Sequence, residues 1–153
     1  MPKPVSVSVD VPYPRDQVFD FLDVMANHEP FNDHLMHDWE YSGPARGVGS
    51  KARVHVKALG IADTIDIEVI DAEVPARIVE RNVAAKAGRT GEGTYELVVL
   101  PGGGTRITFT YRWIVAPMFD RLASPIVRRY LKRNNETSMR RLAEQLPGVL
   151  SRS

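Results

Sequence analysis

Valine occupies every odd position from residue 5 to residue 11, and the positions between these valines are polar. Alternation of β-branched and polar residues is typical of a strand with one buried face. Pro14 follows, and proline favours the first turn of a helix. Apolar residues then recur at helical spacing over residues 18–25, which predicts one short helix. Pro30 fits the first turn of a second short helix, in which Phe31 is expected to be buried.

The same two-residue alternation returns several times between Trp39 and Val115, and turn signals separate its repeats. Gly43-Pro44, Val74-Pro75 and the Pro-Gly-Gly-Gly run at residues 101–104 are typical of turns. Consecutive strands joined by short turns favour an antiparallel meander. The pattern predicts about six further strands, at residues 38–42, 53–58, 64–69, 77–83, 94–99 and 106–115.

After Pro117 the apolar residues recur with the period of a helix, and Pro147-Gly148 ends the pattern. Pro125 is expected to kink or restart this helix. Its buried face is predicted to contain Met118, Leu122, Ile126, Tyr130, Met139, Leu142 and Leu146. A sheet of this size twists and curls, so its concave face suits such a helix.

We therefore predict a single α+β domain over residues 1–153, because no repeat or linker divides the chain. It is expected to consist of a curved antiparallel sheet of about seven strands wrapped around a long C-terminal helix. Two short helices follow the first strand. Packing of this kind leaves space between helix and sheet.

Three stretches of the chain carry a family pattern. In the first, residues 5–22, a strand is followed by a Pro-x-x-x-Val-Phe helix. The second reads Gly-Thr-Tyr-Glu-Leu at residues 93–97 and continues into the hairpin at 101–109. The third is the last helix, with Ser-Pro-Ile-Val at 124–127 and Met-Arg-Arg-Leu-Ala at 139–143. Together they resemble the helix-grip (SRPBCC) superfamily of START lipid-transfer domains, the birch-pollen allergen and polyketide cyclase/dehydrase-like proteins. The resemblance, to the polyketide cyclase/dehydrase-like branch, implies a fold and a binding mode. It implies no reaction, because the superfamily includes enzymes, carriers, receptors and toxins.

An apolar and aromatic stripe is the best candidate for the wall of a cavity. Alternation places the inward side chains of neighbouring strands on one face, and ligand pockets are mostly apolar and aromatic. An ordinary packed core is the alternative. The residues expected to bind an apolar small molecule are Trp39, Ile65, Ile67, Tyr95, Leu97, Phe109, Tyr111, Trp113, Ile126 and Tyr130.

His34, His37 and Tyr111 are the candidates for acid–base chemistry. The two histidines lie in a run with Asp33 and Asp38, and an imidazole beside a carboxylate is the usual general-base pair. A solvated helix end near the cavity mouth is the alternative. The histidine spacing lacks the pattern of a zinc motif, so no metal site is expected.

Other polar groups are expected mainly outside the cavity. His55 lies on a strand face between basic residues, and Asp63 is expected in water at a strand end. Asn82 and Asn134 are further candidates for inward-facing polar groups. Few titratable groups are therefore expected in the cavity, which favours binding over catalysis.

Composition narrows the classes of function. Lys and Arg total 20 and Asp and Glu total 19, a net charge of +1, so no nucleic acid partner is expected. The chain has no cysteine, which excludes disulfides and thiolate catalysis and fits a cytoplasmic location. It shows neither a secretory signal nor a run of about 18 apolar residues, so no transmembrane segment is expected. The glycine-rich segments lack a following helix, so no nucleotide is expected, and no cofactor is predicted.

Three hypotheses for function remain. The first is a protein that binds a hydrophobic small molecule, a lipid or a polyketide-like compound, between the sheet and the last helix. The second is a cyclase, aromatase or dehydratase that acts on a polyketide-like substrate. The third is a regulatory or toxin-like interaction protein that acts through the basic last helix, whose charge also allows peripheral membrane contact. The sequence leaves open whether the protein is an enzyme, and it leaves the oligomeric state open.

Overall fold

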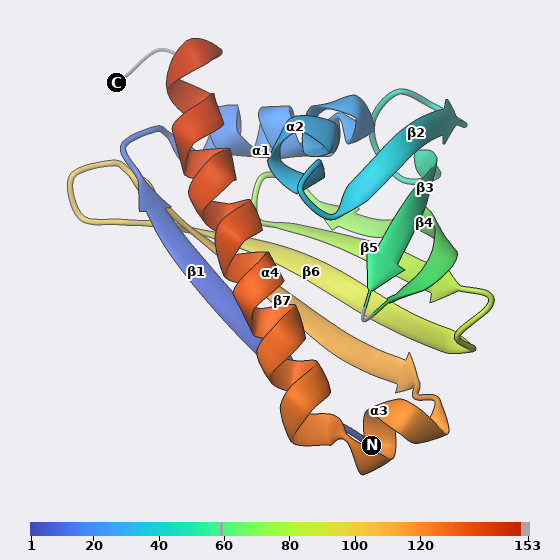
Figure 1. The fold of residues 1–153 in the computed structure, drawn as a ribbon. Coiled ribbons are helices and arrows are strands. Elements are labelled where there is room, and N and C mark those ends of the chain that lie inside the picture. The colour runs from blue at the N-terminus through green and yellow to red at the C-terminus, as the bar shows by residue number, and fades with distance from the viewer. Residues whose placement is uncertain (59, 151–153) are drawn as a thin grey trace.

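The computed structural model describes residues 1–58 and 60–150, and it contains one seven-stranded antiparallel sheet. Strands β2 to β7 form a meander, and β1 pairs with β7 at the edge, in the order β1-β7-β6-β5-β4-β3-β2. The prediction of a curved antiparallel sheet is confirmed (Figure 1). The strands are β1 (Val5–Val11), β2 (Met36–Ser42), β3 (Lys51–Ala58), β4 (Ile61–Glu73), β5 (Arg77–Ala84), β6 (Arg89–Val99) and β7 (Thr105–Val115).

The helices lie on the concave side of this sheet. The long helix α4 crosses the sheet diagonally, and α1 and α2 cover one end of it (Figure 1). Pro14 precedes α1 and Pro30 lies in the first turn of α2, as predicted. The helical elements are α1 (Arg15–Asp23), η1 (Met25–His28), α2 (Glu29–Asn32), α3 (Met118–Leu122), α4 (Ser124–Gln145) and η2 (Leu146–Gly148). Within the described residues, no helix is long and apolar enough to span a bilayer.

The buried face predicted for the last helix is wrong in its first half. Met118, Leu122 and Ile126 are 67%, 78% and 63% exposed. The helix breaks at Ala123, whose backbone is not helical, and it restarts at Ser124 ahead of Pro125. The break separates Met118 and Leu122 from α4, and within the continuous helix α4 Ile126 lies on a different side from Met139 and Leu142. Further along, Met139, Leu142 and Leu146 are buried as predicted.

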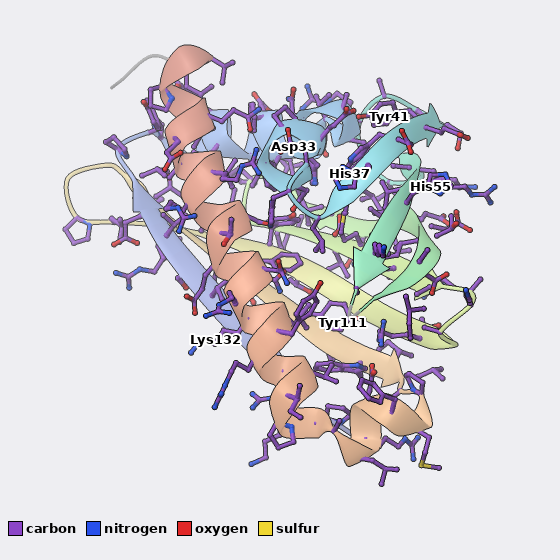
Figure 2. The ribbon with its side chains drawn as sticks, viewed as in Figure 1. Asp33, His37, Tyr41, His55, Tyr111 and Lys132 are labelled. Atoms are coloured by element: carbon purple, nitrogen blue, oxygen red, sulfur yellow. The ribbon has the colours of Figure 1, made fainter. Side chains whose placement is uncertain are left out.

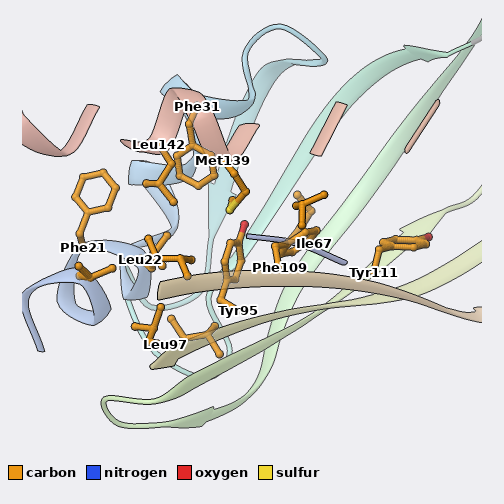
Figure 3. Close-up of a cluster of buried hydrophobic side chains, with 14 of the residues drawn as sticks. Phe21, Leu22, Phe31, Ile67, Tyr95, Leu97, Phe109, Tyr111, Met139 and Leu142 are labelled. Carbon is orange, nitrogen blue, oxygen red and sulfur yellow. The ribbon is translucent and has the colours of Figure 1, made fainter. Parts of the chain in front are cut away.

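The hydrophobic core is solid only toward α1 and α2. Leu22 and Leu142 pack there with Leu97, on one side of Tyr95 (Figure 3). Tyr111 lies on the other side of Tyr95, toward the far end of the sheet (Figure 3). Beneath α4, the end near α1 and α2 is therefore packed with side chains, and the end near Tyr111 is less filled.

An ion pair holds the short helix α3 against the sheet. Asp120 of α3 is fully buried and accepts hydrogen bonds from Nε and Nη2 of Arg89 at 2.5 and 2.7 Å. The indole N–H of Trp113 donates to the same carboxylate at 2.9 Å. Burial alone raises the pKa of Asp120, but these donors outweigh it and hold the pKa below its usual value. Asp120 thus joins α3 to both β6 and β7.

We expect Asp120→Asn to lower the free energy of unfolding by about 2–3 kcal/mol at neutral pH, because the largely buried Arg89 loses its counter-charge. Urea unfolding followed by circular dichroism measures the change. Asp66→Asn is the matched control, because it breaks an ion pair at the surface: the side chains of Arg53 and Asp66 are 58% and 55% exposed. The control is expected to cost less than about 1 kcal/mol. Equal losses in the two variants would contradict this account of α3.

Candidate ligand-binding cavity

A cavity of about 360 Å³ lies between α4 and the concave face of the sheet. Side chains from β2 to β7 form its floor and far wall, and residues of α4 such as Tyr130, Leu131 and Met139 form its near wall. Most of the lining is apolar or aromatic. Of the residues predicted to bind ligand, the lining contains Trp39, Ile65, Ile67, Tyr95, Phe109, Tyr111, Trp113 and Tyr130.

Leu97 and Ile126 were predicted in this lining, and both positions are wrong. Leu97 is 2% exposed and belongs to the solid core beside Leu22 (Figure 3). Strand alternation assigned it the correct face of the sheet but not its position along the strand. Ile126 is 63% exposed and lies on a different side of α4 from Met139.

Two glycines of β6 make room for the aromatic rings of β7. A Cβ atom at Gly91 would lie 2.2 Å from the ring of Tyr111, and a Cβ atom at Gly93 would lie 2.7 Å from the ring of Phe109. Such distances are far below van der Waals contact, so only glycine allows the rings to rest on the neighbouring strand. The rings therefore lie against the sheet and leave the space above them open.

The predicted acid–base residues separate in the structure. Tyr111 lies in the cavity lining beneath α4, whereas His37 lies on β2 beside His55 of β3, and both histidines are exposed (Figure 2). His34 is half-buried, and its Nε2–H donates to the backbone oxygen of Asn134 at 3.3 Å. Neither His34 nor His37 lines the cavity. Among the described residues, no cluster of three or more His, Asp or Glu side chains could hold a metal ion.

Burial favours the neutral forms of Tyr95, Tyr111 and His28, which line the cavity. It raises the pKa of Tyr111 to about 12, and it raises the pKa of Tyr95 well above its usual value. His28, from η1, packs edge-on against Tyr95 with ring centroids 5.5 Å apart. Burial lowers the pKa of His28, whose Nε2–H donates to the Leu22 carbonyl at 2.7 Å.

Asp63 has a structural position that the sequence did not predict. It is half-buried at the cavity wall and is not in open water. Its carboxylate accepts hydrogen bonds from the backbone N–H groups of Thr64, Lys86 and Ala87 at 2.7, 3.1 and 2.9 Å. Asp63 therefore secures the turn between β5 and β6.

Sequence reasoning missed a buried acid in the lining. Glu80 of β5 is 6% exposed and faces the cavity with Asn82 of the same strand. The signal was present, because Ile78, Glu80, Asn82 and Ala84 alternate along one face of β5. Asn82 is inward as predicted, but on α4 the inward residue is Asn135 and not Asn134. The expectation of few titratable groups in the cavity is therefore wrong at Glu80 and His28, which line it together with the predicted tyrosines.

The cavity opens to solvent between the β3–β4 hairpin and α3. Ile61 and Phe119 line it and are also 61% and 54% exposed, so they form its rim. Phe119 precedes Asp120, the residue that anchors α3. The anchored helix thus sets one side of the mouth.

A curved sheet closed by a long helix over an aromatic cavity defines the helix-grip class. The chain belongs to the family described as "Polyketide cyclase / dehydrase and lipid transport", whose model matches residues 3–147. A search of curated proteins finds no significant match.

Solved structures agree on the fold. The chain is similar to TTHA0849 from Thermus thermophilus, with 20% identity, a TM-score of 0.73, and coverage of 97% of this chain and 100% of the other. It is also similar to DynU16 of the dynemicin biosynthetic locus, with 23% identity, a TM-score of 0.64, and coverage of 94% and 47%. BexL, a di-domain ARO/CYC protein of the BE-7585A biosynthetic pathway, shows 18% identity, a TM-score of 0.68, and coverage of 93% and 49%. The chain spans about half the length of the last two.

Glu80 is expected to make stability depend on pH. Burial raises its pKa from 4.5 to about 7, although the Asn82 amide partly offsets the effect. The folded protein then holds this proton more tightly than the unfolded chain does, so Glu80 lowers stability as the pH rises from about 4.5 to about 7. This difference in pKa between the unfolded and folded states corresponds to a loss of about 3 kcal/mol in the free energy of unfolding.

The stability of Glu80→Gln relative to the unmodified protein should therefore increase by about 3 kcal/mol between about pH 4 and about pH 9, measured by urea unfolding. Glu96→Gln serves as the control, because Glu96 is exposed on the adjacent strand. Its effect is expected to stay within about 0.5 kcal/mol over the same range. A flat pH profile for Glu80→Gln would show that the carboxyl is not buried as described.

Proposed function

We propose that this protein binds an apolar small molecule in the cavity between α4 and the sheet. The observation that carries the proposal is the lining itself. Aromatic and aliphatic side chains enclose about 360 Å³ of space, and a few polar groups converge on it. Binding pockets for small molecules have this composition and usually span about 300–1,000 Å³. The volume, at the lower end of that range, favours a compact polyketide-like molecule over a long-chain lipid.

Catalysis by a polyketide cyclase or dehydratase is the second candidate. Glu80 favours it, since a buried carboxyl whose pKa is raised to about 7 suits proton transfer near neutral pH. The family description includes cyclases and dehydrases as well as lipid transport. Binding is common to both candidates, so it is the function that we propose first.

The third hypothesis, interaction through the basic face of α4, receives less support. Several of its cations have partners within the chain. Arg141 pairs with Asp33, and Arg128 donates to the backbone oxygens of Lys3 and Pro4 at 3.0 and 3.1 Å. Lys132 and Arg140 lie within 4.0 Å of glutamates one turn further along the helix. A cavity beneath this helix favours a ligand over a surface partner.

Filling the cavity tests the proposal. Ile65→Trp places an indole in the lining, and we expect it to weaken binding of the fluorescent probe N-phenyl-1-naphthylamine by at least about tenfold. Glu68→Trp is the matched control, because Glu68 is exposed on the opposite face of the same strand. The control should bind the probe as the unmodified protein does. Unchanged affinity in a folded Ile65→Trp variant would overturn the proposal.

A further inference from the structure

Three polar atoms of the cavity lining lack a hydrogen-bond partner among the described residues. They are Oε2 of Glu80, Oδ1 of Asn82 and Nδ2 of Asn135. A buried polar atom without a partner costs free energy, so folded proteins contain few of them. Here three occur in one apolar cavity, which makes chance a poor explanation.

Neighbouring polar groups of the lining show the usual pattern. Ser138 lies one turn beyond Asn135 on α4, and its hydroxyl donates to Oδ1 of Asn32 at 2.8 Å. The amide of Asn32 in turn donates to the His28 carbonyl at 3.0 Å. These groups satisfy one another, whereas Glu80, Asn82 and Asn135 each keep one buried polar atom without a partner in the cavity lining.

The three residues come from two opposite walls. Glu80 and Asn82 are on β5, in the middle of the sheet, and Asn135 is on α4, which covers it. Asn82 offers an acceptor and Asn135 offers a donor, and the Glu80 carboxyl accepts when charged and donates when protonated. A group between the walls must therefore both donate and accept.

We propose that Glu80, Asn82 and Asn135 form a recognition site for a hydroxyl or enol group carried by an otherwise apolar ligand. A hydroxyl donates one hydrogen bond and accepts others, so it can serve both walls at once. A hydrocarbon of the same size fills the apolar part of the cavity but leaves these atoms unpaired. This inference rests on the proposed function and specifies the ligand class: phenols, enols and hydroxylated ring systems.

A recognition role would explain why Glu80 is buried here although its burial lowers the stability of the fold. Burial raises the pKa of Glu80 and makes its charged form unfavourable, and a hydrogen bond with the Asn82 side chain compensates for only part of this effect. A ligand hydroxyl would supply a further hydrogen bond at the same carboxyl. Loss of stability at a ligand site is a frequent consequence of keeping polar groups ready for a ligand.

A pair of probes with the same ring system tests the inference. 2-Naphthol and 2-methylnaphthalene differ only in a hydroxyl and a methyl group, and each is measured by displacement of N-phenyl-1-naphthylamine at a pH where the naphthol is neutral. We expect 2-naphthol to bind at least about tenfold more tightly, as one well-formed buried hydrogen bond allows. Equal affinities would overturn the recognition site and leave the proposed function intact. Absence of binding by N-phenyl-1-naphthylamine as well as by both naphthalenes would overturn both.

Two variants of α4 locate the effect. Asn135→Leu should remove most of the preference for 2-naphthol while 2-methylnaphthalene binds as well as before or better. Gln145→Leu is the matched control, because Gln145 also carries a buried unpartnered atom, Oε1, but does not line the cavity. Its preference should equal that of the unmodified protein. A preference that persists in folded Asn135→Leu would remove Asn135 from the site, and Asn82→Leu then tests the opposite wall in the same way.

Discussion

The rings of Phe109 and Tyr111 rest on a part of β6 that has no side chains. Gly93 and Gly91 allow this close approach, and any larger residue would push the rings up toward α4. At the other end of the sheet, Leu142 of α4 packs with Leu22 of α1 in the solid part of the core. The open space lies between the two rings and α4, and it is the space that the proposed ligand occupies.

Polar groups in an apolar cavity work against the stability of the fold. Glu80 is nearly inaccessible to water, and no described cation pairs with it. By contrast, the buried carboxylate of Asp120 has a guanidinium and an indole N–H as donors. Burial therefore serves different ends at the two acids: Asp120 holds α3 in place, and Glu80 keeps a carboxyl oxygen unpaired for the proposed ligand. Places where local rules of stability are broken are frequently functional.

Most of the fold could be predicted from the sequence because its strands alternate cleanly. The valines of β1 and the aromatics of β7 indicated the buried faces directly, and the prolines marked the helix starts. The restart of the last helix near Pro125 was predicted, but the position of α3 was not, because its Asp120 is held by Arg89, which is 31 residues away in the chain. Periodicity carries no information about contacts at that distance in the chain.

The cavity was predictable in composition but less so in detail. Alternation assigns a residue to a face of the sheet, and it does not say whether that face is packed or hollow at a given point along the strand. Leu97 and Tyr95 share a face of β6, yet only Tyr95 reaches the cavity. Glu80 was within reach of the same reasoning, since it shares its face with Ile78. The overlooked signal was a charged residue on the strand face that also carries Ile78 and Ala84.

The ion pair between Asp120 and Arg89 has a consequence for how a ligand would enter the cavity. Swinging α3 outward would strip the carboxylate of its three hydrogen bonds at once. We therefore expect α3 to stay in place as a fixed side of the cavity opening. The opposite side of the opening is formed at Ile61, the first residue of β4, which has no comparable buried ion pair among the described residues.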